Sequence, residues 1–308
     1  MPDSRPDFSA AADQLSSVRD FLRFALSSFR AARIVHGHGT SSALDEAAFL
    51  ILETLNLPVD DINPWLDARL LENERNAIAE IIRRRIETRM PAAYLVNRAY
   101  IHGIPFHVDE RVIVPRSYLG ELMFSGIFGG EEAPLIADPD NVGSVLDLCT
   151  GSGCLAIIAA GIFPGAEIDA TDLSADALDV ARINVGEHGL EERISIFQGD
   201  LFEPLEGRSY DLIIANPPYV PGGEVQAFPP EYGHEPVMAH LAGDDGLDIV
   251  RRILDQAADF LNPGGGLLCE VGTGRERLVD AYPHLDFLWL DTEESEGEVF
   301  WITREDLT

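Results

Sequence analysis

Residues 210–219 read Tyr-Asp-Leu-Ile-Ile-Ala-Asn-Pro-Pro-Tyr, an apolar run followed at once by an amide, two prolines and an aromatic ring. The run is typical of a strand buried in a parallel sheet. Pro217 and Pro218 end the strand because neither has a backbone N–H for the ladder, and their fixed φ stiffens the loop. Alone, the motif could be a turn and nothing more. Ligands of open α/β sheets bind where strands end, so we expect a rigid loop that holds a small planar polar group.

The chain around this loop alternates strand and helix patterns from residue 142 onward. Strands are expected near 142–148, 166–171, 193–198, 210–215, 265–271, 285–291 and 297–303. Helices are expected near 153–163, 174–188, 244–261 and 274–281. This alternation predicts an α/β fold with a mostly parallel, doubly wound, seven-stranded sheet. The last two strands follow each other without a helix, so the final strand should pair antiparallel.

The first part of the chain has a different pattern. Apolar residues at helical spacing predict three helices, over about 14–35, 40–57 and 68–89. A period of two then predicts a β-hairpin, followed by a helix that runs through Phe124 and Phe128, and an acidic exposed loop over 131–141. We therefore expect a helical domain over 1–91, a hairpin linker over 92–117 and an α/β domain over 118–308.

The charge is unusual and unevenly distributed. The formal net charge is −31, and all 22 basic residues are arginine. Residues 1–100 hold 14 acids and 12 arginines, whereas residues 101–308 hold 39 acids and 10 arginines. Such an excess repels phosphate backbones, which argues against a nucleic-acid substrate. Two compatible explanations remain, adaptation to high salt and attraction of a basic protein partner, and the first accounts better for most of the charge.

Several features indicate a cytoplasmic protein. No apolar run reaches membrane-spanning length, and the first residues lack the pattern of a signal peptide. Cys149, Cys154 and Cys269 show neither zinc-like spacing nor a disulfide framework, so no metal is expected. Cys149 and Cys154 have apolar neighbours and are expected to be packing residues. The sequence leaves the oligomeric state open.

Three successive strand ends carry residues suited to an adenosine with a short tail. After the first strand comes Asp147-Leu148-Cys149-Thr150-Gly151-Ser152-Gly153, whose glycines let the backbone approach a ligand. Asp172 ends the second strand, where a carboxylate suits the two hydroxyls of a ribose. Asp200 and Phe202 follow the third strand and could take an adenine amino group and face.

These motifs resemble those of class I S-adenosylmethionine methyltransferases and, more narrowly, of HemK-type protein-(glutamine N5) methyltransferases. The resemblance also covers residues 114–117, 231–236 and 243–248, and so extends over nearly the whole chain beyond the first dozen residues. Release-factor enzymes of that family usually carry Pro-Arg-Pro, whereas this chain has Pro115-Arg116-Ser117. That form is similar to the PrmB branch, which methylates large-subunit ribosomal protein L-three.

The resemblance implies a Rossmann-like methyltransferase domain, a helical substrate-recognition domain, S-adenosyl-L-methionine as cofactor and a glutamine of ribosomal protein L-three as acceptor. Asn216, Pro217 and Tyr219 are the expected catalytic residues, and these three with Pro218 the expected substrate-binding residues. The expected cofactor-binding residues are Asp147, Cys149, Thr150, Gly151, Ser152, Gly153, Asp172, Asp200, Leu201, Phe202 and Asn216. Arg116 is expected either to anchor the hairpin to the next helix or to lie near the cofactor carboxylate.

A primary amide nitrogen is a poor nucleophile because its lone pair is delocalised into the carbonyl. We expect Asn216 Oδ1 and the Pro217 carbonyl each to accept one N–H of the substrate glutamine, which orients the nitrogen and stabilises its growing charge. Tyr219 is expected to pack against the amide and the sulfonium methyl. No strong base is needed, because the methylated cationic amide loses its proton readily.

Three other functions fit parts of the pattern. A release-factor glutamine methyltransferase would use the same chemistry. A nucleic-acid adenine amino-methyltransferase would present a similar planar donor to the loop, but the acidity of residues 101–308 argues against it. A non-catalytic cofactor-binding module is disfavoured because the Asn-Pro-Pro-Tyr loop is intact.

Overall fold

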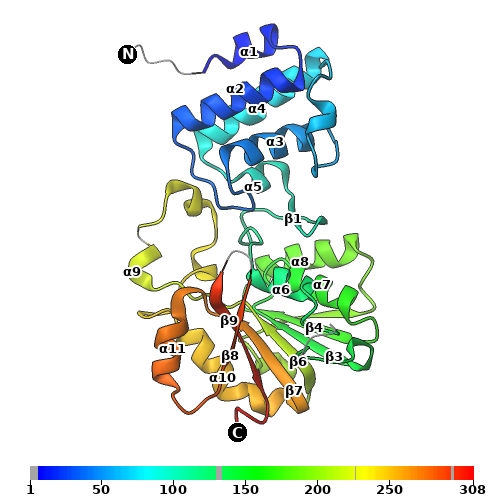
Figure 1. Ribbon diagram of the computed structural model, residues 1–308, viewed down its shortest axis with the longest axis vertical. Coiled ribbons are helices and arrows are strands. Elements are labelled where there is room, and N and C mark those ends of the chain that lie inside the picture. Colours follow the sequence, from blue (N-terminus) through cyan, green and yellow to red (C-terminus); the bar gives the residue numbers. More distant parts are fainter. Residues whose placement is uncertain (1–5, 130–133, 226, 293–294) are drawn as a thin grey trace. The chain divides into compact units, whose positions relative to one another are not determined.

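The computed structural model describes residues 6–129, 134–225, 227–292 and 295–308 (Figure 1). The chain forms two compact units. The helical unit comprises Met1–Pro105 and Pro229–His234, and the sheet unit comprises Phe106–Phe228 and Glu235–Thr308. Part of the expected acidic loop, at 130–133, lies outside the described residues.

The helical unit is built around apolar faces of its first helices. Its elements are α1 (Phe8–Gln14), α2 (Val18–Ala32), α3 (Ala43–Thr54), α4 (Glu72–Thr88), α5 (Ala92–Val96) and the hairpin strands β1 (Ala99–Ile101) and β2 (Ile104–Phe106), the last of which ends at the unit boundary. Phe21 and Phe29 of α2 pack with Leu50 of α3 and Ile78 and Ile82 of α4, all fully buried. Burying five such side chains contributes on the order of 10 kcal/mol before entropy is subtracted.

The helix expected over 14–35 is present as α2, which begins at Val18, a few residues later than expected, because Ser17 forms a capping box that starts it. The Ser17 hydroxyl accepts from the Asp20 amide at 3.3 Å, and an Asp20 carboxylate oxygen accepts from the Ser17 amide at 3.0 Å. Such reciprocal bonds satisfy two of the free N–H groups of a helix N-terminus. The short helix α1, before this range, was not expected.

The expected hairpin over 92–117 is shorter in the structure. Residues Ala92–Val96 form α5, and only 99–106 form the hairpin. Ala92 and Ala93 follow Pro91, and proline just before a run of helix formers favours a helix start. The second and third helices begin at Ala43 and Glu72, a few residues later than expected.

The helical unit is completed by a segment from far along the chain. Residues Pro230–His234 form a short 3₁₀ turn, and Glu231 is fully buried in the unit. One Glu231 carboxylate oxygen accepts from the Val35 amide at 3.1 Å and from Arg89 Nη1 at 3.2 Å. The unit is therefore discontinuous in sequence.

The sheet unit has the expected seven-stranded α/β architecture. Its strands are β3 (Ser144–Leu148), β4 (Glu167–Asp172), β5 (Ile194–Gln198), β6 (Tyr210–Ala215), β7 (Leu261–Glu270), β8 (Leu288–Asp291) and β9 (Glu296–Thr303). The strand order is β5-β4-β3-β6-β7-β9-β8. Strands β3 to β7 run parallel, and β9 is antiparallel to both of its neighbours, as expected for the last strand. The parallel strands fan out on both sides of β3 and β6, a topological switch point.

Helices cover both faces of this sheet (Figure 1). They are α6 (Tyr118–Phe124), α7 (Cys154–Ile162), α8 (Ala175–Glu187), α10 (Asp248–Phe260) and α11 (Arg275–Ala281), whereas the short α9 (Gly222–Val225) belongs to a loop apart from the strands. The helix expected through Phe128 ends at Phe124. On one face, Val250, Ile253 and Ala257 of α10 are buried against Ile213 and Leu267 of the sheet. In the described ranges, no helix combines the length and the apolar character that crossing a membrane requires.

Candidate active site

A cavity of about 330 Å³ lies at the carboxyl ends of β3, β4, β5 and β6, where the sheet topology predicts a ligand site. Its walls contain predicted site residues from all four strand ends. These are Cys149, Gly151, Asp172, Asp200, Leu201, Asn216 and Pro218. Other walls come from residues 111–113, from Pro236, Met238, Ala239 and Leu241, and from Ile249 of α10. The sequence pattern did not place these residues at the site, because they lie far in sequence from the strand ends.

The glycine loop is shaped by a buried carboxylate below it. Asp147 does not line the cavity; its Oδ2 accepts from the Thr150 hydroxyl at 2.5 Å and from the Ala156 amide at 3.0 Å. Burial raises the pKa of the Asp147 carboxyl to about 7. Thr150, Ser152 and Gly153 likewise lie outside the cavity lining. We conclude that these four residues form the loop and that Cys149 and Gly151 face the cavity.

Positive φ values make the loop turn sharply into α7. Cys149, Gly151 and Gly153 have φ of 58°, 55° and 79°. A Cβ at Gly153 would lie 3.2 Å from the Cβ of Ala181 on α8, a tight contact, and the positive φ favours glycine at this position. Burial raises the pKa of the Cys149 thiol well above its usual value, which keeps it protonated and agrees with a packing role.

Asp172 both supports the loop and faces the cavity. Its Oδ2 accepts from the Gly151 amide at 2.9 Å, and its Oδ1 accepts from the Ser174 amide at 2.8 Å. Burial raises the pKa of this carboxyl, although the backbone donors oppose the shift. Each oxygen keeps a second lone pair, so the side chain can accept from two neighbouring hydroxyls, as a ribose presents.

The third strand end differs from the expectation at Phe202. The ring of Phe202 is buried and stacks on Phe260, with centroids 4.5 Å apart, and does not line the cavity. Leu201, with φ of 53°, faces the cavity in its place. Asp200 lines the cavity and pairs with Arg252 of α10 at 2.9 Å. An adenine ring here would lie against an aliphatic side chain rather than an aromatic one.

The Asn-Pro-Pro-Tyr loop follows β6 directly. Asn216 and Pro218 line the cavity, whereas Pro217 is buried and Tyr219 is half-buried outside the lining. The Tyr219 hydroxyl donates to Glu270 Oε1 at 2.9 Å. Burial, with the nearby Glu270 charge, raises the pKa of Tyr219 far above its usual value, so the ring stays neutral.

Three polar side chains hold these loops through partners that the sequence did not reveal. Asn184 of α8 is fully buried and donates to the Ser152 carbonyl at 2.8 Å and to the His107 carbonyl at 3.0 Å. Glu235 forms two bonds with the Arg116 guanidinium, at 2.6 and 2.8 Å, which supports the anchor role for Arg116. Glu270 is the third. No local pattern reveals these partners, because each is remote in sequence.

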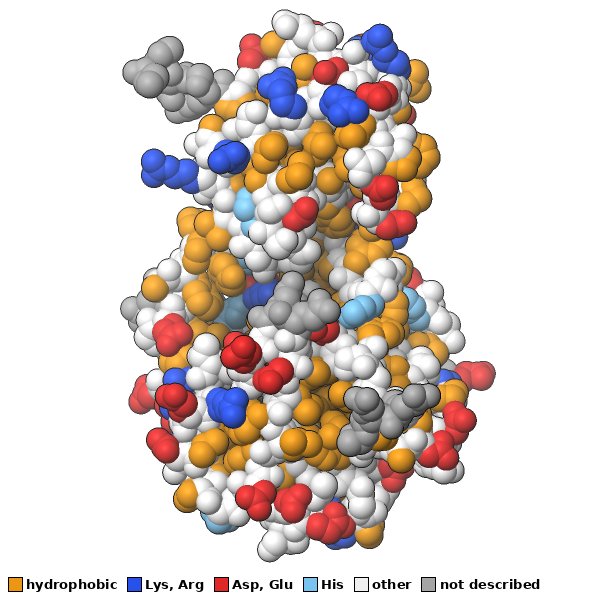
Figure 2. Space-filling model, in the orientation of Figure 1, with side chains coloured by type: hydrophobic (Ala, Val, Ile, Leu, Met, Phe, Trp, Pro, Cys, Tyr) orange, Lys and Arg blue, Asp and Glu red, His pale blue; other side chains and the backbone are white. Residues whose placement is uncertain are grey.

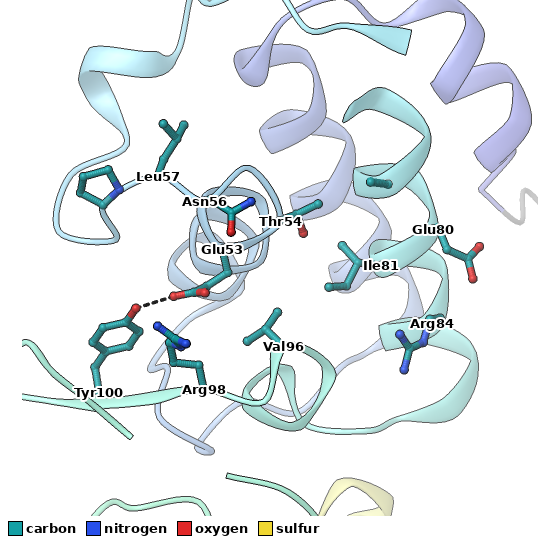
Figure 3. Close-up of a pocket in the computed structure, with 12 residues that line it drawn as sticks. Glu53, Thr54, Asn56, Leu57, Glu80, Ile81, Arg84, Val96, Arg98 and Tyr100 are labelled. Atoms are coloured by element: carbon teal, nitrogen blue, oxygen red, sulfur yellow. Dashed lines mark hydrogen bonds between the residues drawn. The ribbon is translucent and has the colours of Figure 1, made fainter. Parts of the chain in front are cut away.

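The helical unit has a hollow of its own, of about 750 Å³, between α3, α4, α5 and β1 (Figure 3). Leu57, Ile81 and Val96 are among its lining residues, and the Tyr100 hydroxyl donates to Glu53 at 2.5 Å across one wall. Arginine and glutamate side chains both stand on its rim, so its charge does not select a ligand.

Comparison with known proteins agrees with the sheet unit's site. A family model described as "Methyltransferase small domain" matches residues 135–228, which contain the glycine loop, Asp172, Asp200 and Asn216. Longer matches come from whole proteins. The "Ribosomal protein uL3 glutamine methyltransferase" of Bradyrhizobium diazoefficiens is 53% identical over 295 residues, which are 96% of this chain and 92% of that protein.

The protein with the same name in Neisseria meningitidis serogroup B is 53% identical over 300 residues, 97% of each chain. The one in Burkholderia pseudomallei is 50% identical and covers 94% of this chain and 95% of that protein. This chain belongs to the same family. The uL3 glutamine methyltransferase family thus includes both units of the structure, because the matches span the helical unit as well as the sheet unit.

Membership of the uL3 glutamine methyltransferase family confirms two predictions from the sequence. The chain is a methyltransferase, and its relatives are named for glutamine methylation of a ribosomal protein, as the PrmB-like motif implies.

Proposed function

We propose that this protein transfers a methyl group from S-adenosyl-L-methionine to the side-chain amide nitrogen of a glutamine in ribosomal protein L-three (uL3). One observation carries the proposal: Asn216, at the end of β6, lines the same cavity as the glycine loop, Asp172 and Asp200. A planar amide bound at Asn216 would therefore lie beside the cofactor. The names of relatives about 50% identical over nearly the full chain support the choice of acceptor.

The residues present fit an adenosine-containing cofactor. Asp172 offers free lone pairs to two hydroxyls, Asp200 offers a carboxylate to an amino group, and Leu201 offers an apolar surface to a flat ring. S-adenosyl-L-methionine supplies a methyl group on a positively charged sulfur. The cavity walls hold two carboxylates, Asp172 and Asp200, and one guanidinium, Arg111, so the acids outnumber the base there.

Asn216 and the Pro217 carbonyl have the chemistry to orient the acceptor. Oδ1 of Asn216 and a carbonyl that leaves the strand ladder each accept one N–H of a glutamine amide, which directs the nitrogen lone pair toward the donor. Alignment of this kind can lower a displacement barrier by roughly 7–11 kcal/mol. The same two acceptors stabilise the positive charge that grows on the nitrogen. Water then takes the proton from the methylated amide.

The domain roles follow the same proposal. The helical unit would recognise the protein acceptor, and the hairpin over 99–106 would link it to the catalytic part. The −31 net charge makes a nucleic-acid acceptor unfavourable, and arginines are more frequent on the helical unit in the face drawn in Figure 2, whereas acids are spread over the sheet unit.

The test is an acceptor assay with labelled methyl donor and three separate acceptors, uL3, release factors and DNA, followed by mass spectrometry. Label on a glutamine of uL3 is the expected result. Label on release factors alone would agree with methylation of a glutamine amide but would refute uL3 as the acceptor. Label on adenine would refute the role given to the Asn-Pro-Pro-Tyr loop.

A further inference from the structure

Glu270, at the end of β7, is a buried carboxylate to which no role in the reaction has so far been given. Glu270 is only 1% exposed to solvent. Oε1 accepts from the Tyr219 hydroxyl at 2.9 Å. Oε2 accepts from the Ser117 hydroxyl at 2.6 Å and from the Tyr118 amide at 3.0 Å. Because both oxygens are engaged from different sides, the carboxylate has one orientation.

Tyr219 is confined on other sides as well. A Cβ at Gly272, two residues after Glu270, would lie 2.6 Å from the Tyr219 ring, so the ring rests on bare backbone. A Cβ at Gly246 would lie 2.3 Å from the Tyr219 carbonyl oxygen. Both glycines have positive φ. The ring and the backbone of Tyr219 thus occupy a slot in which the hydroxyl reaches only Glu270 among the described hydrogen-bond partners.

We propose that Glu270 is a positioning residue for methyl transfer: it fixes Tyr219 and thereby the placement of Asn216 Oδ1 and the Pro217 carbonyl. The loop from 216 to 219 is held by β6 at its start and by the Tyr219–Glu270 bond at its end. Two prolines lie between, and their fixed φ transmits the constraint. This proposal rests on the proposed function, because it assumes that the loop orients the acceptor amide.

Ser117 extends the same anchor to α6. Its hydroxyl accepts from the Leu119 amide at 3.2 Å as the helix N-cap while it donates to Glu270. The first turn of α6 and the end of the catalytic loop therefore share one carboxylate. Loss of that carboxylate would loosen both elements together.

A double-mutant cycle with Glu270→Gln and Tyr219→Phe tests the proposal. Glutamine keeps the size of the side chain and can still accept from Ser117 and Tyr118 with its oxygen, but its NH₂ can only donate to the Tyr219 hydroxyl, so the charge-assisted bond from that hydroxyl to the carboxylate is lost. Each single variant should lower kcat with uL3 about tenfold or more, with cofactor affinity retained, because one charge-assisted bond is lost. The double variant should be no worse than the poorer single variant, since both remove the same bond.

Tyr210→Phe is the matched control. Tyr210 begins the strand that leads to the catalytic loop, is buried, and donates to the Asp169 carboxylate at 2.7 Å. Loss of the Tyr210 hydroxyl should lower the unfolding temperature about as much as Tyr219→Phe does but leave kcat unchanged. Single-variant effects that add in the double variant, or a control that loses kcat equally, would overturn the proposal.

Hydrogen exchange gives a readout that does not depend on turnover. The Val220 amide donates to the His240 carbonyl at 2.9 Å, and the Ala242 amide donates to the Val220 carbonyl at 3.1 Å. Both amides should exchange faster in Glu270→Gln and in Tyr219→Phe, and at the wild-type rate in Tyr210→Phe. Unchanged exchange would overturn the positioning role even if uL3 is methylated. A wild-type enzyme that labels no protein would refute the proposed function instead.

Discussion

Asn216 is the side chain on which the proposed chemistry depends most, since it offers an amide oxygen at the edge of the cavity. Asn216→Ala should reduce kcat by roughly 10²-fold or more, because the variant loses an acceptor that stabilises charge on the reacting nitrogen. Cofactor affinity, measured by calorimetry, should change little. Asn262→Ala is the control, because Asn262 bonds Asp211 at 2.7 Å outside the cavity lining. Full turnover in Asn216→Ala would exclude the assigned role.

Asp147 should make the stability of the sheet unit depend on pH. Its pKa is about 7 in the folded chain, against about 3.9 in an unfolded one. Because its pKa is raised on folding, the Asp147 carboxyl contributes to the stability of the folded chain in full below about pH 4, and this contribution is lost as pH rises through about 7. Asp147→Asn, which stays neutral, should flatten this part of the profile. The free energy of unfolding, measured with denaturant at pH 5 and at pH 8, should fall more between these pH values in the wild type than in Asp147→Asn. An equal fall in both proteins would contradict the assignment.

Single residues were predictable where a local rule applies and not elsewhere. The glycine loop, Asp172 and Asn216 follow from strand ends, which short patterns mark. Phe202 was misplaced because a positive φ at Leu201 turns the chain, so that Leu201 and not the next residue faces the cavity. Asn184, Arg252 and Glu270 bond partners that are remote in sequence, and nothing local identifies them.

Helix α2 offers a test of the capping interaction that the sequence pattern did not reveal. Ser17→Ala removes the side-chain acceptor at the N-cap and should destabilise the helical unit by about 1 kcal/mol. Ser27→Ala is the control on the same helix, since Ser27 is exposed and its hydroxyl donates back to the Arg23 carbonyl at 2.7 Å. That change should be neutral or slightly stabilising. Equal losses in both variants, measured by urea unfolding, would argue against the cap.

Elements were predicted well where hydrophobic period and length agree, as in the parallel strands. The order in which the strands pair was harder to predict from the sequence. The antiparallel last strand was expected, but its insertion between β7 and β8 was not, because pairing depends on contacts between distant segments. The short helix α5 was missed because a five-residue helix has too few turns to show a period.

For the whole molecule, the charge predicts a response to salt. A net charge of −31 creates self-repulsion in the folded state, and raising salt from 0.1 M to 1 M shortens the screening length from about 10 Å to about 3 Å. The unfolding temperature should therefore rise with KCl over this range. Calorimetry measures it, and a flat or falling trend would count against salt adaptation.

The alternative use of the charge, attraction of a basic acceptor, has a separate kinetic signature. Electrostatic attraction weakens with salt, so KM for uL3 should then rise over the same range while kcat changes little. A constant KM together with a rising unfolding temperature would leave salt adaptation as the sufficient explanation.

The late segment of the helical unit has a consequence for how the protein is made. Residues up to Pro105 leave the ribosome first, but Glu231, which pairs with Val35 and Arg89, is added much later. At typical rates of translation the delay is on the order of ten seconds. During that time the nascent helical unit lacks the carboxylate that later accepts from the Val35 amide and from Arg89. The first unit to be synthesised is thus finished only after most of the second has been translated.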